Sequence, residues 1–238
     1  MSISRIEWTD ATWNPVTGCS KISEGCLHCY AEKMSMRLKA MGQANYRNGF
    51  EVTCHEHMLD YPLRWRKPRT IFVNSMSDLF HEKIPDEFIF RVFEIIKRAS
   101  WHRFQILTKR AERMKTLSQF LPWPENIWLG VTVENDGCRG RIDVLKTIPA
   151  SVRFLSMEPL LSAVPNIDLN LLDWIIVGGE SGPGARPMER EWVEDIRIQC
   201  SRRQIPFFFK QWGGVKKKVV GRILNGRTYD EMPNYAIP

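Results

Sequence analysis

The chain has 238 residues, of which 43% are hydrophobic and 26% charged, with nine Trp and twelve Phe. This composition excludes a disordered chain and supplies enough apolar material for one large core. No apolar run approaches the ~20 residues that span a bilayer, and the first residues, MSISRIEWTDATWNP, lack the apolar segment of a signal peptide. We therefore expect a cytoplasmic protein with no membrane partner.

The charge is basic, because 34 Lys and Arg outnumber 27 Asp and Glu and leave a net charge of +7. The excess is concentrated in four short segments: RWRKPR (64–69), KRAERMK (109–115), SRR (201–203) and KKK (216–218). A basic surface of this kind suits a nucleic acid or another polyanion, and it also suits a plain solvated surface. Charge alone leaves both interpretations open.

Short apolar runs recur along the chain and indicate strands. They are IFV (71–73), FQIL (104–107), IWLGV (127–131), VRFL (152–155), WIIV (174–177) and PFFF (206–209). FEVTC (50–54) is a weaker candidate, and a further strand is possible before the first cysteine. Continuous apolar runs of this length are typical of strands buried on both faces, as in a parallel sheet.

Segments between these runs have helical spacing. Apolar residues at 31, 34, 38 and 41 predict a helix whose Met-rich stripe faces the core. A second stripe, from Phe88 to Ile96, follows a helix start at Pro85-Asp86, and a third runs from Trp192 to Cys200. Strands that alternate with helices predict an α/β fold with a parallel sheet, here a TIM-like βα barrel that is either partial or closed. We expect it to form a single domain over residues 1–238, with a basic tail at about 214–238.

Each strand run is followed by polar residues. In a parallel barrel the carboxyl ends of the strands converge on one mouth, where active sites lie. We therefore expect a shared site there, in which carboxylates bind the ammonium or hydroxyl groups of a ligand. About half of the candidate residues should contact the ligand, and the others should form structural ion pairs with one another. The candidates are Ser75, Asp78, Lys109, Glu134, Asn135, Glu158 and Lys210.

Three cysteines, Cys19, Cys26 and Cys29, lie within the segment GCSKISEGCLHCY (18–30). In a reducing compartment such a group is more typical of a metal site than of disulfides. A [4Fe–4S] cluster held by three cysteines keeps one iron open for another ligand. The alternative is zinc bound by Cys26, Cys29, Cys54 and His57, which leaves Cys19 without a role. The two other cysteines, Cys138 and Cys200, are expected to pack in the core.

The motifs WNPVTGC, GCLHCYA, NSMSDLF, LTKR, MEPLL and GGESG extend over most of the chain. On these motifs the sequence resembles the radical SAM superfamily, and more closely the phage and bacterial three-cysteine-motif proteins, whose chemistry is undetermined. The resemblance implies that the three cysteines hold a [4Fe–4S] cluster whose open iron binds S-adenosylmethionine. It further implies an electron donor, and reductive cleavage of the sulfonium to a 5′-deoxyadenosyl radical that abstracts hydrogen from a substrate. His28 would lie beside the adenine.

The glycine-rich segment GGESGPGARP (178–187) bears on the same cofactor. In the superfamily a Gly-Gly-Glu segment contacts the amino group of the cofactor after an early strand, whereas Gly178, Gly179 and Glu180 follow a late one. The first two cysteines are also separated by six residues rather than the usual three. As a phosphate loop the segment is a weak match, since it lacks both the GK[ST] ending and the G-x-G-x-x-G order.

From these features we expect a radical-based modification of an undetermined substrate, with a nucleic acid or nucleotide as the first choice. Two alternatives remain open. One is a zinc-stabilised nucleic-acid-binding protein without catalysis, and the other is a phosphate-binding βα enzyme with structural cysteines.

Overall fold

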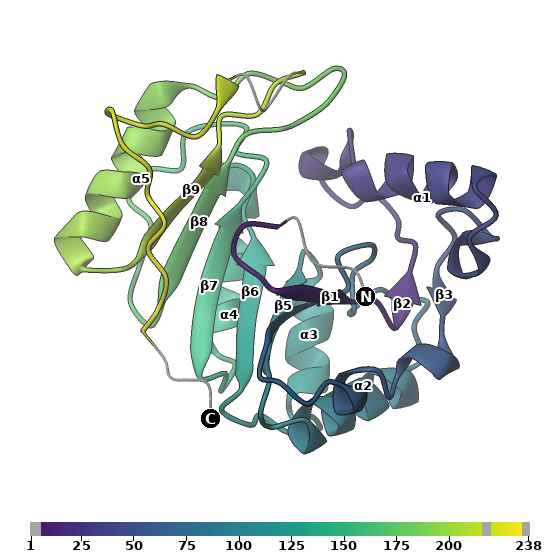
Figure 1. The fold of residues 1–238 in the computed structure, drawn as a ribbon. Coiled ribbons are helices and arrows are strands. Elements are labelled where there is room, and N and C mark those ends of the chain that lie inside the picture. The colour runs from purple at the N-terminus through teal and green to yellow at the C-terminus, as the bar shows by residue number, and fades with distance from the viewer. Residues whose placement is uncertain (1–5, 216–219, 235–238) are drawn as a thin grey trace.

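Seven parallel strands form the main sheet in the computed structural model, which describes residues 6–215 and 220–234. Their order is β1-β4-β5-β6-β7-β8-β9, so neighbours in the sheet follow one another along the chain. The bounds are β1 Ala11–Trp13, β4 Thr70–Val73, β5 Arg103–Thr108, β6 Ile127–Thr132, β7 Val152–Met157, β8 Trp174–Gly178 and β9 Phe207–Gln211. Figure 1 shows the sheet curling into an open half-barrel with β1 and β9 at its edges.

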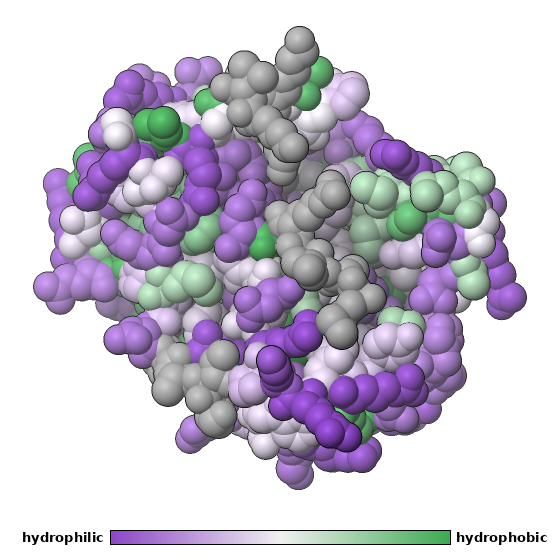
Figure 2. All heavy atoms as spheres, viewed as in Figure 1, coloured by the Kyte–Doolittle hydropathy of each residue, from purple (hydrophilic) through white to green (hydrophobic). Residues whose placement is uncertain are grey.

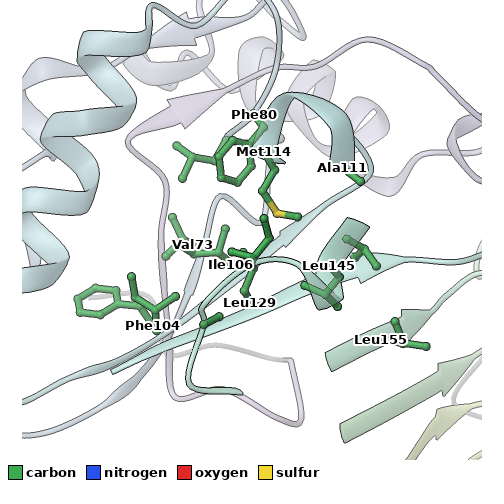
Figure 3. Packing of buried hydrophobic residues seen from close by; sticks show 14 of the residues in the cluster. Val73, Phe80, Phe104, Ile106, Ala111, Met114, Leu129, Leu145 and Leu155 are labelled. Atoms are coloured by element: carbon green, nitrogen blue, oxygen red, sulfur yellow. The ribbon is translucent and has the colours of Figure 1, made fainter. Parts of the chain in front are cut away.

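Four helices pack on the outer face of this curl: α2 (Asp86–Arg98), α3 (Ala111–Ser118), α4 (Gly140–Lys146) and α5 (Arg190–Arg203). Figure 3 shows how Ile106 of β5 and Leu129 of β6 pack together with Met114 of α3. All three side chains are fully buried. The apolar stripes predicted for α2 and α5 are confirmed, since they bury Phe93 and Ile96 in one helix and Ile196 in the other.

Aromatic rings fill the inner face of the half-barrel near the amino ends of the strands. The cluster joins Trp8, Phe72, Trp128, Phe154, Trp174 and Phe208. Gly130 of β6 makes room for it, because a Cβ at this position would lie 2.5 Å from the ring of Phe154. This packing fills the inner face of the curl near the amino ends of the strands.

The six predicted strands of the main sheet are confirmed, but the segment FEVTC is not part of that sheet. Its residues Thr53–Cys54 form β3, which pairs antiparallel with β2 (Val16–Thr17) in a separate two-stranded sheet. The strand that the sequence allowed before the first cysteine is present twice, as β1 and β2.

The predicted core position of the Met-rich stripe on α1 (Tyr30–Ala40) is wrong. Met34 is 41% exposed and Met41, at the end of the helix, is 61% exposed, whereas only Ala31 and Ser35 are buried within α1. The reason is that α1 lies beyond the end of the sheet and does not pack on its face (Figure 1). Figure 2 shows apolar atoms gathered on the surface over this helix.

The C-terminal segment 220–234 covers the edge strand β9. The backbone N–H of Phe209 donates to Tyr229 O at 2.9 Å, and the indole of Trp174 donates to Glu231 O at 2.8 Å. The lysines of the predicted basic tail, KKK (216–218), lie outside the described residues. Within the described ranges, every helix is too short or too polar to cross a membrane.

Candidate functional site

The segment that carries the three cysteines lies at the carboxyl ends of the sheet strands and leads directly into α1. Cys19 follows β2, Cys26 ends the short 3-10 turn Glu24–Cys26, and Cys29 is the residue before α1. All three thiols are free and partly accessible. The turn into this segment depends on Gly18, whose φ of +83° is unfavourable for other residues and whose added Cβ would lie 2.2 Å from Glu51 O.

Arg110, at the end of β5, makes the first attachment between the sheet and this cysteine loop (residues 18–30). Its Nη1 lies 3.5 Å from the Sγ of Cys19 and 3.2 Å from Asp78 Oδ2, while Nη2 donates to Ser20 O at 3.1 Å. Asp78 also accepts from the hydroxyl of Thr108 at 2.7 Å. Its carboxylate therefore has protein donors on both oxygens.

Glu134, after β6, makes the second attachment. It is fully buried, and it accepts a hydrogen bond from the hydroxyl of Ser23 at 2.5 Å. Lys109 lies 3.3 Å and Arg141 2.7 Å from its oxygens. Burial on its own raises the pKa of Glu134, but the two cations and the Ser23 hydroxyl outweigh it and hold the pKa at about 2. A Cβ at Gly25 would lie 2.4 Å from the Glu134 side chain, so the loop packs directly on this carboxylate.

Glu180, after β8, makes the third attachment through Arg186. The guanidinium donates to the carboxylate at 2.6 and 2.9 Å, and its Nη2 also donates to Glu24 O at 3.0 Å. Burial raises the pKa of Glu180, but the hydrogen bonds and charge of Arg186 outweigh it, so the pKa is lowered. The His28 ring packs against this segment, because a Cβ at Gly184 would lie 2.9 Å from it.

Glu158, after β7, is bound by two side chains of β9. Lys210 contacts both of its oxygens at 2.9 Å, and the side-chain amide of Gln211 donates to it at 2.7 Å. Nearby, the Tyr30 hydroxyl of α1 donates to the carbonyl of Ser75, so the helix is attached to the loop after β4. Asn135 donates from its side chain to Glu24 at 3.2 Å.

The glycines of GGESG serve the packing of two chain segments. A Cβ at Gly179 would lie 2.0 Å from Trp212 O, and one at Gly178 would lie 3.3 Å from the Glu158 carboxyl carbon. The segments after β8 and β9 therefore approach each other at a distance that only glycine permits. This contact accounts for Gly179, whereas Gly182 has a φ of +106° that favours glycine.

The structure brings the predicted site residues together around the cysteine loop, but it gives the carboxylates protein partners. All four, Asp78, Glu134, Glu158 and Glu180, are paired with Lys or Arg. Sequence reasoning missed four of the residues that make these attachments: Ser23, Arg110, Arg141 and Arg186. Arg110 stands in the strand-end motif TKR (108–110), where a search for cations would have found it.

The donor set can be tested against the two metal types that the sequence suggests. Zn–S bonds of about 2.3 Å place the sulfurs of one zinc site about 4 Å apart. Among the described residues, no three His, Cys, Asp or Glu side chains are arranged around a single metal ion. In an iron–sulfur cluster each thiolate binds a different iron, which separates the sulfurs further. Three accessible thiols on one loop suit that group in number and chemistry.

The thiol of Cys19 is protonated near neutral pH. Burial, reinforced by the charge of Asp78, raises the pKa of Cys19 to about 11. A thiol must lose its proton to bind a metal, so a metal at Cys19 would have to displace this proton.

Buried polar atoms without a hydrogen-bond partner lie around the same end of the sheet. Among the described residues they include His28 Nδ1, Asn74 Nδ2, Ser181 Oγ and Gln211 Oε1. His28 Nδ1 is 3.7 Å from Glu180, which is too long for a hydrogen bond. Buried polar groups in native proteins are nearly always paired. Each of these four atoms therefore has a hydrogen-bonding position open to water or to a small polar molecule.

The fold and the site together define an α/β half-barrel protein with a cysteine loop attached across its open end. The chain belongs to the family described as "Protein of unknown function (DUF5131)", whose model matches residues 3–233. Comparisons with curated proteins and with solved structures found no match.

Proposed function

We propose that this protein is an iron–sulfur enzyme of the radical SAM type, built on a partial TIM-like barrel. In this proposal Cys19, Cys26 and Cys29 hold a [4Fe–4S] cluster, and S-adenosylmethionine binds at its open iron. The observation that carries the proposal is that three free thiols share one loop, and that this loop is attached to residues following three different strands of a parallel sheet.

The residues of the chain would divide the work as follows. A reduced cluster with one open iron would supply an electron to the sulfonium of bound S-adenosylmethionine. The cysteines hold the irons, and the unpaired atoms of His28, Asn74 and Gln211 provide hydrogen-bond partners for the cofactor. The ion-paired carboxylates Glu134 and Glu180 keep the loop seated over the sheet, which limits the access of water to the cofactor.

A nucleic acid or nucleotide is the substrate class that the surface favours. Exposed cations surround the cysteine loop and α1: Lys21, Lys33, Arg37, Lys39 and Arg47. Phosphates bind such groups by charge and by the release of counterions. A protein of this function would work in the reducing cytoplasm and would need an electron donor for the cluster.

Anaerobic reconstitution with iron and sulfide tests the proposal. We expect a brown protein with about four irons per chain if every corner is filled. Adding S-adenosylmethionine to the reduced protein should change its electron paramagnetic resonance spectrum and release 5′-deoxyadenosine slowly. A colourless protein that carries stoichiometric zinc after the same treatment would refute the proposal and support the zinc-stabilised alternative. If the spectrum shows a cluster but does not change when S-adenosylmethionine is added, the proposed metal site is supported and the proposed reaction is refuted.

A further inference from the structure

Arg110 is a buried cation at the base of the cysteine loop. Its side chain is only 4% exposed, although guanidinium groups are rarely buried without a specific set of acceptors. The residue follows β5 and directly precedes α3, so its backbone is fixed by two elements of the main fold. Its backbone N–H also donates to the hydroxyl of Thr108 at 2.9 Å.

The guanidinium uses all three of its nitrogens. Nε lies 3.0 Å from both oxygens of Glu82, and Nη2 donates to Ser20 O at 3.1 Å and Ser20 Oγ at 3.0 Å. Nη1 lies between Asp78 Oδ2 at 3.2 Å and Cys19 Sγ at 3.5 Å. One rigid group therefore contacts the first cysteine, the residue after it and a buried carboxylate of the sheet.

The contact of the guanidinium with a sulfur is made to Cys19. The sulfur of Cys26 lies 3.6 Å from the neutral hydroxyl of Ser23, whereas Cys19 has a cation. A cationic donor to a thiolate makes a stronger hydrogen bond than a neutral donor does. Hydrogen bonds to the sulfurs and the local net charge are also among the features that set the potential of an iron–sulfur cluster.

We propose that Arg110 is the positioning residue of the cluster site, which holds Cys19 in place and offsets the negative charge of its bound thiolate. The inference rests on the proposed function. A planar group is required because Cys19, Ser20 and Asp78 are contacted together, and the point charge of a lysine cannot reach three acceptors in a fixed arrangement. Removing the cation should disfavour the reduced cluster, because the added electron makes the site more negative.

Two variants and a control test this role. Arg110→Gln removes the charge, Arg110→Lys keeps it but loses the planar geometry, and Glu82→Gln removes only the negative charge of the 61% exposed partner of Nε. Each protein is reconstituted without oxygen, and three quantities are measured: irons per chain, the rate of iron loss to a chelator, and the midpoint potential of the cluster. Circular dichroism and thermal melting before reconstitution report whether each variant is folded.

We expect Arg110→Gln to lose iron several-fold faster than the wild type and to have a more negative midpoint potential. Arg110→Lys should also lose iron faster but should keep a potential near that of the wild type, while Glu82→Gln should match the wild type in iron retention. If folded Arg110→Gln keeps its iron and its potential, the role of Arg110 is refuted while the cluster itself stands. If Arg110→Gln does not fold, the role of Arg110 is refuted when Arg110→Lys loses iron no faster than the wild type. A wild type that binds no iron refutes the proposed function and this inference with it.

Discussion

Glu134→Gln is the substitution for which the structure makes the most quantitative prediction. The carboxylate is fully buried between Lys109 and Arg141, and it receives the Ser23 hydroxyl from the cysteine loop. Glutamine preserves the shape but removes the charge. Lys109 and Arg141 then lose the partner that compensates them, and breaking a buried ion pair from one side typically costs 3–5 kcal/mol.

The lowered pKa leads to a similar magnitude. Its fall from the ordinary 4.5 to about 2 corresponds, at 1.36 kcal/mol per pH unit, to about 3 kcal/mol of folding free energy. We therefore expect Glu134→Gln to lower the free energy of unfolding at pH 7 by about 3 kcal/mol, and the melting temperature by roughly 6–12 °C.

The stability difference between the wild type and Glu134→Gln should depend on pH. Because the pKa is lowered in the folded state, the charged carboxylate stabilises the fold fully above pH 4.5, and this contribution is lost as the pH falls towards 2. The difference between wild type and Glu134→Gln should therefore be constant from pH 7 to 5. Below pH 4.5 it should shrink by about 1.4 kcal/mol per pH unit.

Urea unfolding of the metal-free proteins under reducing conditions, at pH 7, 5 and 3.5, measures this difference. Glu112→Gln on the exposed face of α3 is the matched control and should remain within about 0.5 kcal/mol of the wild type at each pH. A Glu134→Gln variant as stable as the wild type at pH 7 would contradict the reasoning. So would a stability difference that does not change between pH 5 and 3.5.

Three further predictions follow from the site and the core. Cys19→Ala should abolish iron retention after reconstitution, whereas Cys54→Ala should leave it largely intact because Cys54 is part of β3; the opposite pattern in an iron assay would favour the zinc set. Gly130→Ala should destabilise the protein by about 1–3 kcal/mol, since the new Cβ would lie 2.5 Å from the Phe154 ring, and a melting curve equal to that of the wild type would contradict this. Met114→Ala should cost about 2–5 kcal/mol in urea unfolding because the side chain is fully buried, and a cost below about 1 kcal/mol would mean that the core collapses around the cavity.

The strands of the main sheet could be predicted from the sequence because both of their faces are buried. A strand covered on both sides needs apolar residues at consecutive positions, and this pattern is visible without knowledge of the partner strands. IFV (71–73), for example, became Thr70–Val73, and WIIV (174–177) became Trp174–Gly178. Their alternation with helices also determined the parallel arrangement, and hence that the polar strand ends share one side of the sheet.

The role of α1 could not be predicted in the same way. A 3-4-3 spacing shows that a helix has an apolar face, but it does not show what lies against that face. Met34 and Met41 have the spacing of core residues and are exposed, because α1 lies beyond the sheet ends and not on its outer layer.

The carboxylates show the same division between sequence and tertiary structure. Their positions at the strand ends followed from local pattern, so Asp78, Glu134 and Glu180 could be named as candidates. Their partners could not be, because Ser23 reaches Glu134 from a segment 111 residues away, and Arg110 reaches Asp78 across 32 residues. Which charge neutralises which carboxylate depends on how the loops converge in space. That convergence, and with it the attachment of the cysteine loop across the open end of the sheet, was decided only by the tertiary structure.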